Sequence, residues 1–242
     1  MAARPVVDSF IGTAGVPPWP RLWCYNTGSG WTGEAQTYTS STDNVSLDGN
    51  GHLAITARRA PDGSYTSGRI KTEGSLTMGY GRVEATILMP PGPGLLPAFW
   101  LLGSNYPTVG GLAAGEIDII ECVRGTIQHT IHGPGADGAD YNDGAGVNVW
   151  KVPVIDPTSR FRTYWAERSK DKIVIGVDTT TTATFTPASL PPGGQWVFND
   201  QPMFAILNLA VGDVGNSWVG APDPSTPFPQ TMLVDSFRFT PS

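Results

Sequence analysis

The chain has 242 residues, a length that suits a single β-sandwich or barrel with a large core, and its 30 glycines and 22 prolines indicate many turns. Its net charge of −6 and the lack of any basic run make nucleic acid and anionic membrane surfaces poor partners. No run of about 18 apolar residues occurs, so we expect no membrane-spanning helix.

Predicted β-strands follow one another along the chain as short apolar or alternating runs between turn residues. In the first of them, Leu53, Ile55 and Ala57 share one face. The predicted strands cover 52–58, 82–89, 172–178, 182–185, 204–211 and 231–240. No segment keeps a helical period for three turns. We therefore expect an all-β protein of two packed antiparallel sheets.

No internal repeat, low-complexity tract or linker interrupts the chain, which predicts one β-sandwich domain over residues 1–242. Eight tryptophans are a high number for this length. Aromatic faces stack on sugar rings, so this excess indicates a carbohydrate ligand, with core packing as the alternative for each ring. Two cysteines, Cys24 and Cys122, allow one disulfide, which the sequence alone does not establish.

Three acidic residues are clustered in residues 115–121, which read Gly-Glu-Ile-Asp-Ile-Ile-Glu. The isoleucines predict a strand packed on a core. On a regular strand Glu116 and Asp118 share one face, whereas Glu121 falls on the other face and into the core. Burying a lone carboxylate is very costly. We therefore predict a β-bulge near Ile119–Ile120 that turns Glu121 back to the face of the other two acids.

A row of acids on one strand face has three interpretations. Two carboxyl groups about 5–5.5 Å apart can hydrolyse a glycosidic bond with retention of configuration, and crowding raises the pKa of the group that must stay protonated. The same acids could bind a cation such as calcium. They could also form a solvated strand face. The isoleucines between the acids, and the lack of a glycine-containing ligand loop, fit a metal loop poorly.

The acidic motif, Glu-x-Asp-x-x-Glu after Gly115, resembles the active-site signature of glycoside hydrolase family 16, in the bulged form of its laminarinase-like members. Other segments are similar to the same family and occur in the family's order. They are residues 47–53, 80–85, 97–103, 132–135, 206–212 and 228–235. The resemblance covers roughly residues 8 to 240. It implies a concanavalin-like jelly-roll sandwich of two curved antiparallel sheets, with a cleft across the concave face.

The resemblance also implies an activity. The expected enzyme is a retaining endo-hydrolase of β-1,3-glucan, with a laminarin-type polysaccharide as its substrate. By the matching motif positions, Glu116 would be the nucleophile, Glu121 the acid/base and Asp118 the assisting acid. No cofactor is expected for catalysis.

Six further residues are expected to bind substrate by their match to family positions. Trp100 would floor the cleft and His132 would lie near the acid/base, while Arg69 and Asn208 would face the sugar and Trp31 and Trp218 would rim the cleft. The alternatives are core packing for the tryptophans, a surface ion pair for the arginine and a buried amide for the asparagine. His129 and His132 are three apart and face opposite ways on a strand, so a zinc pair is not expected.

A structural calcium site on the convex side is a further implication of the resemblance. Asp235 would supply a carboxylate, joined by backbone carbonyls near Gly51 and the N-terminal strand. Ser9 stands where an acid usually follows Asp8 in the family, which would weaken this site.

Several positions depart from the family pattern. Leu96 stands where a tryptophan is often found, so one sugar platform would be missing. Arg162 and Arg168 replace residues that are usually His and Trp, and Cys122 directly follows the acid/base. Residues 137–156 match the family poorly. These departures leave the three acids in place and affect the expected preference for particular sugars.

Two other functions remain open. One is an inactive carbohydrate-binding protein of the same fold, which the complete row of acids disfavours. The other is hydrolysis of another β-glycan, such as mixed-linkage glucan, agarose or a galactan. The first residues, Met-Ala-Ala-Arg-Pro, lack the apolar region of a signal peptide. Because its substrate would be extracellular, we expect a secreted, monomeric protein whose signal peptide has been removed, rather than a cytosolic one.

Overall fold

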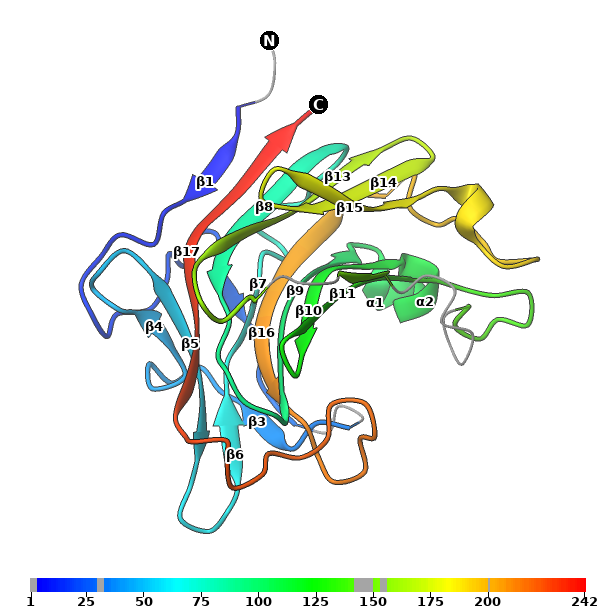
Figure 1. The fold of residues 1–242 in the computed structure, drawn as a ribbon. Helices are drawn as coiled ribbons and strands as arrows, with labels where there is room; N and C mark the ends of the chain where they lie inside the picture. Colours follow the sequence, from blue (N-terminus) through cyan, green and yellow to red (C-terminus); the bar gives the residue numbers. More distant parts are fainter. Residues whose placement is uncertain (1–3, 30–32, 142–149, 153–155, 200) are drawn as a thin grey trace.

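The structure is a computed structural model that describes residues 4–29, 33–141, 150–152, 156–199 and 201–242. Within these residues the chain forms two packed sheets, one of ten strands and one of seven. Both sheets curve in the same sense, with β16 and β9 of the seven-stranded sheet on the inner side of the curve (Figure 1). The fold is thus the all-β jelly roll that the sequence predicts.

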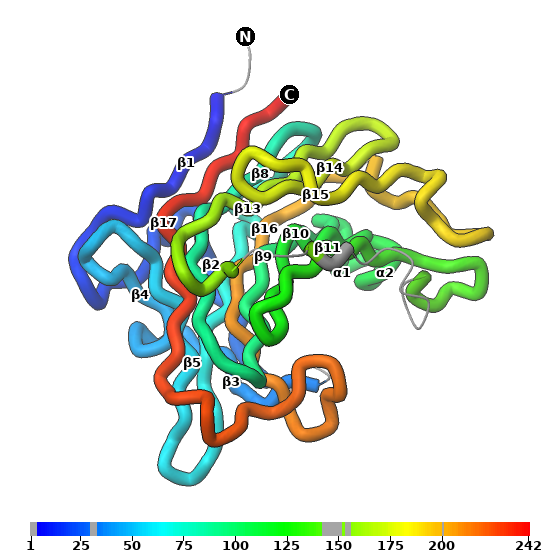
Figure 2. The backbone as a smooth tube through the Cα atoms, in the orientation of Figure 1, coloured from blue at the N-terminus to red at the C-terminus, as the bar shows by residue number. Residues whose placement is uncertain are grey.

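The ten-stranded sheet forms the outer layer. Its strands are β1 (Val6–Asp8), β3 (Gln36–Tyr38), β4 (Val45–Leu47), β5 (Leu53–Arg59), β6 (Tyr65–Ser67), β8 (Gly81–Leu88), β13 (Arg162–Ser169), β14 (Lys172–Val177), β15 (Thr180–Phe185) and β17 (Gln230–Pro241). Their order is β15–β14–β13–β8–β17–β5–β6–β3, with β1 beside β17 and β4 beside β5. All neighbours among the described strands are antiparallel except β3 and β6. The pairing of β1 with β17 places the first described strand beside the last one (Figure 2).

The seven-stranded sheet forms the inner layer. Its strands are β2 (Cys24–Tyr25), β7 (Arg69–Lys71), β9 (Leu95–Gly103), β10 (Glu116–Val123), β11 (Thr126–His132), β12 (Trp150–Val152) and β16 (Met203–Val211), in the order β12–β11–β10–β9–β16–β7–β2. Among the described residues, three short helices lie outside the sheets: α1 (Tyr106–Val109), α2 (Gly111–Ala114) and the 3₁₀ turn η1 (Pro187–Ser189). None of the described helices is long and apolar enough to cross a membrane.

All six predicted strands outside the acidic motif are present, with ends shifted by at most two residues. The sequence pattern did not predict β9, because this strand has little alternation and contains Pro97. Proline lacks the N–H that a central strand needs. Pro97 is tolerated here because it lies one residue beyond the last β9–β10 pair, which joins Ala98 to Glu121.

The main core lies between the sheets. On β8, Val83, Ala85 and Ile87 are buried and alternate with partly exposed residues, as expected for a strand with one core face. β16 is buried over its whole length. Phe204 and Ile206 of this strand belong to a second apolar cluster, separate from the main core, together with Leu102 and Ala114. Trp100 packs against this second cluster.

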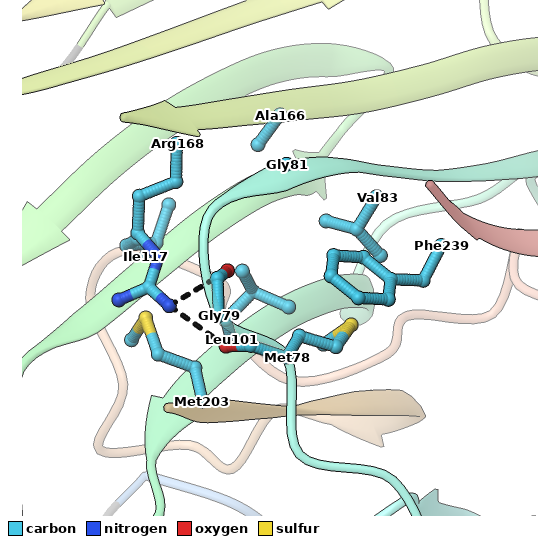
Figure 3. Close-up of a pocket in the computed structure, with 10 residues that line it drawn as sticks. All are labelled: Met78, Gly79, Gly81, Val83, Leu101, Ile117, Ala166, Arg168, Met203 and Phe239. Carbon is cyan, nitrogen blue, oxygen red and sulfur yellow. Dashed lines mark hydrogen bonds between the residues drawn. The ribbon is translucent and has the colours of Figure 1, made fainter. Parts of the chain in front are cut away.

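Arg168, one of the departures from the family pattern, lies buried between the sheets near the end of β13 (Figure 3). Its guanidinium donates hydrogen bonds of 2.7 to 3.0 Å to the carbonyls of Met78, Gly79, Phe198 and Gln201. Burial lowers its pKa to about 10, so the side chain stays cationic at neutral pH. The arginine therefore ties the segments before β8 and β16 to the outer sheet, beside a cavity of only about 10 Å³.

The two cysteines do not pair. Cys24 is exposed on β2, whereas Cys122 is buried on β10, and both are free thiols. The disulfide that the sequence left open is therefore absent from these two positions. Burial raises the pKa of Cys122 to about 12, so its thiol is protonated and acts as a small apolar group in the core.

Candidate active site

A cavity of about 240 Å³ opens on the inner sheet, and the three clustered acids face it together. The residues that line it are Glu34, Arg69, Leu96, Ala98, Trp100, Glu116, Asp118, Glu121 and Asn208. All of them except Glu34 belong to β7, β9, β10 and β16. The cavity is therefore built on rigid sheet, which holds its side chains in place.

A β-bulge in β10 turns Glu121 toward this cavity. Asp118 pairs with Thr130 of β11, but the next pair joins Glu121 to Gln128, so His129 alone faces two residues of β10. The pairing with β9 shifts at the same place. Ile119 and Ile120 are both completely buried in the main core. The predicted break in pairing at these isoleucines is confirmed, and with it the return of Glu121 to the side of Glu116.

His129 stabilises the bulge from the neighbouring strand. Its Nδ1 lies 2.6 Å from the carbonyl oxygen of Ile119, and its Nε2 lies 2.8 Å from the hydroxyl of Thr182 on β15. Burial lowers the pKa of His129 to about 4, so the ring is neutral. Nδ1–H therefore donates to Ile119 and Nε2 accepts from Thr182. The ring satisfies a carbonyl in the segment where the bulge interrupts regular pairing.

His132 lies opposite Glu116 on β11 and contacts two aspartates. Its Nδ1 is 2.5 Å from Asp140 Oδ2. Its Nε2 lies 3.1 Å from Asp118 Oδ2, which is an ion-pair distance. The two atoms do not meet the geometry of a hydrogen bond. Burial would lower the pKa of His132, but Asp118 and Asp140 outweigh burial and raise the pKa to about 11. His132 is thus a cation beside the acids.

The surroundings distinguish the two glutamates. Burial, and then the charge of Asp118, raises the pKa of Glu116, while His132 and Arg69 act in the opposite direction. For Glu121, burial and the charges of Asp118 and Glu116 raise the pKa well above its usual value, and His132 is the cation that opposes them. Two cations therefore favour ionised Glu116, whereas one acts on Glu121. Glu121 is the better proton donor of the pair.

Trp100 is held on the cavity floor by Asn208. The indole N–H donates to Asn208 Oδ1 at 2.7 Å, and Asn208 Nδ2 lies 3.3 Å from the hydroxyl of Tyr38. The guanidinium of Arg69 lies 4.8 Å from the centre of the Trp100 ring. Asn208 is 4% exposed and also lines the cavity. It is therefore both a buried amide and a cavity residue. Arg69, Trp100 and Asn208 are thus brought to one place.

We expect Trp100→Ala to weaken glucan binding and lower activity. Stacking of a buried aromatic ring contributes about 0.5–1.5 kcal/mol beyond the area it covers, which corresponds to an increase in KM of about 2- to 13-fold. Trp100→Phe is the matched variant, because it keeps an aromatic face, although a smaller one, and removes the indole N–H that donates to Asn208. If the alanine variant loses stability and its KM is unchanged, Trp100 is a core residue and not a sugar platform.

Glu34 lines the cavity and was not predicted from the sequence. Its carboxylate accepts a hydrogen bond from Gln36 Nε2 at 2.5 Å and another from the hydroxyl of Tyr38. The signal in the sequence is the spacing of Glu34, Gln36 and Tyr38, which puts all three on one face of an extended segment. Glu34 is remote from the acidic cluster in the sequence, so the pattern around the acids does not point to it.

The two predicted rim tryptophans have different outcomes. Trp218 is 42% exposed and does not line the cavity. It directly follows residues 213–217, which are joined to Gly33 by hydrogen bonds from the backbone of Asp213 and the side chain of Asn216. Trp31 lies outside the described residues. Contact of either ring with sugar remains a prediction.

The predicted calcium ligands lie on neighbouring segments. β17 and β5 pair through Val234 and Leu53, which puts Asp235 next to the turn that contains Gly51. The Asp235 carboxylate lies 4.0 Å from His52 Nε2 and is half-exposed. A carboxylate and backbone carbonyls are the oxygen donors that calcium takes. Asp8 is already used, since it accepts hydrogen bonds from Phe10 N–H and the Trp23 indole.

We expect calcium to raise the melting temperature without being required for hydrolysis. A ligand that binds only the folded state at 100 times its Kd stabilises by about 2.7 kcal/mol, which for a chain of this size is a shift of roughly 5–10 °C. Asp235→Asn should abolish the shift, whereas Asp43→Asn, on an exposed turn, should retain it. Reversible loss of activity in a chelator, with the fold retained, would contradict a purely structural ion.

One further group of ligand atoms lies in the cavity. Atoms of Glu116, Asp118 and His132 come within 4.8 Å of one another. Both nitrogens of His132 already face carboxylate oxygens, those of Asp118 and Asp140.

A sheet-built cavity with two glutamates, an aspartate between them and an aromatic floor defines the class of protein as a glycoside hydrolase. The family description "Glycosyl hydrolases family 16" matches residues 32–227. The chain belongs to this family, as its motifs indicate.

Solved structures and characterised proteins agree with this membership. The laminarinase catalytic domain from Thermotoga maritima MSB8 is 32% identical with a TM-score of 0.82, over 100% of this chain and 98% of that one. "Beta-glucanase" of Rhodothermus marinus is 34% identical over 91% of this chain and 79% of that protein. "Glucan endo-1,3-beta-glucosidase A1" of Niallia circulans is 30% identical over 89% of this chain, which spans only 35% of that protein.

Proposed function

We propose that this chain is an endo-β-1,3-glucanase that cleaves laminarin-type glucan with retention of configuration. Glu116 is the nucleophile, Glu121 the acid/base and Asp118 the assisting acid. One observation carries the proposal: the β10 bulge brings Glu121 to the same cavity as Glu116 and Asp118. The names of the glucanases described above support β-glucan as the substrate class.

The first chemical step joins the sugar to Glu116. Glu121 donates its proton to the glycosidic oxygen while the Glu116 carboxylate attacks the anomeric carbon from the opposite face. The bond to the leaving sugar breaks, and a covalent glycosyl–enzyme ester forms. Burial and neighbouring carboxylates raise the pKa of Glu121, which keeps its proton available at neutral pH.

The second step releases the product. Glu121, now ionised, takes a proton from a water molecule that attacks the anomeric carbon, and Glu116 leaves as a carboxylate. The two inversions restore the original configuration. His132 and Arg69 favour the ionised form of Glu116 and thereby make it a better leaving group. Asp118, between the two glutamates, raises the proton affinity of both.

The deciding experiment measures products from several polysaccharides. Purified protein is incubated with laminarin, mixed-linkage glucan, agarose and a galactan, and reducing ends are assayed over time. We expect laminarin to be cleaved fastest, with oligosaccharides of intermediate length appearing first, and proton NMR to show the β-anomer as the first product. An α-anomer first would mean inversion. Binding of laminarin without any cleavage would identify a carbohydrate-binding protein instead.

Three further properties belong to the same proposal. The chemistry uses only side chains, so we propose that it needs no cofactor. A polysaccharide too large to enter a cell implies that the protein acts outside it, which supports secretion. The monomeric state is also a proposal, which size-exclusion chromatography with light scattering tests directly.

A further inference from the structure

Asp140 contacts His132, beside the acidic cluster, from outside every segment that resembles the family. It lies beyond β11, in a short loop held together by its own backbone. Gly135 N–H donates to Ala139 O at 2.7 Å, and Tyr141 N–H donates to Gly133 O at 3.1 Å. A bridge between Pro134 and Asp140 completes the turn. The loop thus returns the Asp140 carboxylate to the end of β11, where His132 lies.

The ring of His132 has a carboxylate oxygen at each nitrogen. Asp140 Oδ2 lies 2.5 Å from Nδ1, and Asp118 Oδ2 lies 3.1 Å from Nε2. Neutral imidazole carries a single N–H and can face only one acceptor as a donor. A second carboxylate oxygen at ion-pair distance from Nε2 therefore favours the doubly protonated ring. Asp140 also constrains the ring's orientation, because a hydrogen bond to Nδ1 leaves Nε2 on the side of Asp118.

Charged groups surround this ring on several sides. Asp118 and Glu116 face it from β10, and Glu121 acts on it from further along the same strand. Asp140 faces it from the loop, and Arg69 of β7 acts on Glu116. Acids outnumber cations in the cluster, so the protonation state of His132 alters the pKa of every acid next to it.

We propose that Asp140 is a positioning residue that holds His132 as a cation, with Nε2 at ion-pair distance from Asp118, so that two cations rather than one act on Glu116. This inference rests on the proposed function, in which Glu116 attacks as a carboxylate. Asp140 is not among the residues that line the cavity. It acts through His132, whose charge favours the ionised nucleophile.

The direct test is a nitrogen NMR titration of the histidine rings, of which the chain has three. In the unaltered protein we expect His132 to keep both ring protons up to pH 8. In Asp140→Asn the pKa of His132 should fall to near that of an ordinary histidine, about 6.5, because the loss of an anionic partner disfavours the cation. Asp137→Asn is the matched control: it lies in the same loop and its side chain caps Ala139 N–H. An unchanged titration in Asp140→Asn overturns the proposal.

Activity gives a second readout. Below the lowered pKa both proteins carry protonated His132, whereas above it only the unaltered protein does. We expect kcat/KM of Asp140→Asn on laminarin to lie within about 3-fold of the unaltered protein at pH 5 and at least about 10-fold below it at pH 8. Asp140→Glu, which restores the charge, should recover part of the loss at pH 8. An equal loss at every pH would mean that Asp140 only supports the loop.

The two readouts separate this inference from the proposed function. The titration requires no turnover, so it stands even if laminarin is not the substrate. If the unaltered protein cleaves no glucan while the titration behaves as expected, the proposed function fails and the role of Asp140 toward His132 remains. If laminarin is cleaved and the titration does not change, Asp140 has no such role.

Discussion

Glu116→Gln should reduce turnover of laminarin at least ~10³-fold while leaving the fold intact. Glutamine keeps the size of the side chain but carries no negative charge, so it does not attack the anomeric carbon. The covalent intermediate then does not form, and the remaining groups have no step to assist. Reducing-end release under substrate saturation measures the loss directly.

A control distinguishes lost chemistry from lost structure. Glu84→Gln removes a carboxylate of the outer sheet, where Glu84 pairs with Arg82 at 2.7 Å and with Arg238 at 3.9 Å. Partly exposed pairs of this kind contribute little stability, about 0–1 kcal/mol, so this variant should retain full activity. Circular dichroism and melting curves should show folded protein for both variants. Hydrolysis by Glu116→Gln within about tenfold of the unaltered rate would refute the assignment of the nucleophile.

Glu121→Gln should also lose at least ~10³-fold on laminarin, but for a different reason. The sugar that leaves is an alcohol and needs a proton, which glutamine does not donate. A substrate with an acidic phenol as its leaving group, such as dinitrophenyl β-laminaribioside, does not need that proton. Its first step should therefore survive in this variant, and the covalent intermediate should accumulate.

Azide then provides a test that only an acid/base variant passes. Azide is a nucleophile that needs no general base, so it should restore turnover of the aryl substrate by Glu121→Gln. The product should be the β-glycosyl azide, because two displacements at the anomeric carbon retain configuration. Glu116→Gln should give no such rescue with that stereochemistry. A Glu121→Gln protein that hydrolyses laminarin normally, or that azide does not rescue, would remove Glu121 from this role.

The strand pattern of the acidic motif was sufficient to predict its local structure. The side-chain period of a strand and the cost of a buried carboxylate act within a few residues, so they are legible in Glu116, Asp118 and Glu121 themselves. The bulge follows from these two constraints and is present at Ile119–Ile120. The sequence did not reveal that His129 of β11 would donate to the carbonyl of Ile119.

The sequence by itself therefore determined the all-β class, the row of acids and the bulge that unites them, because each depends on alternation and burial within single strands. The contacts that tune the acids were decided by the tertiary structure. Trp100 meets Asn208 across 108 positions of the chain, and Asp140 reaches His132 only because its loop folds back. Such contacts depend on the order of strands in the sheet and on the path of loops, which no local periodicity encodes.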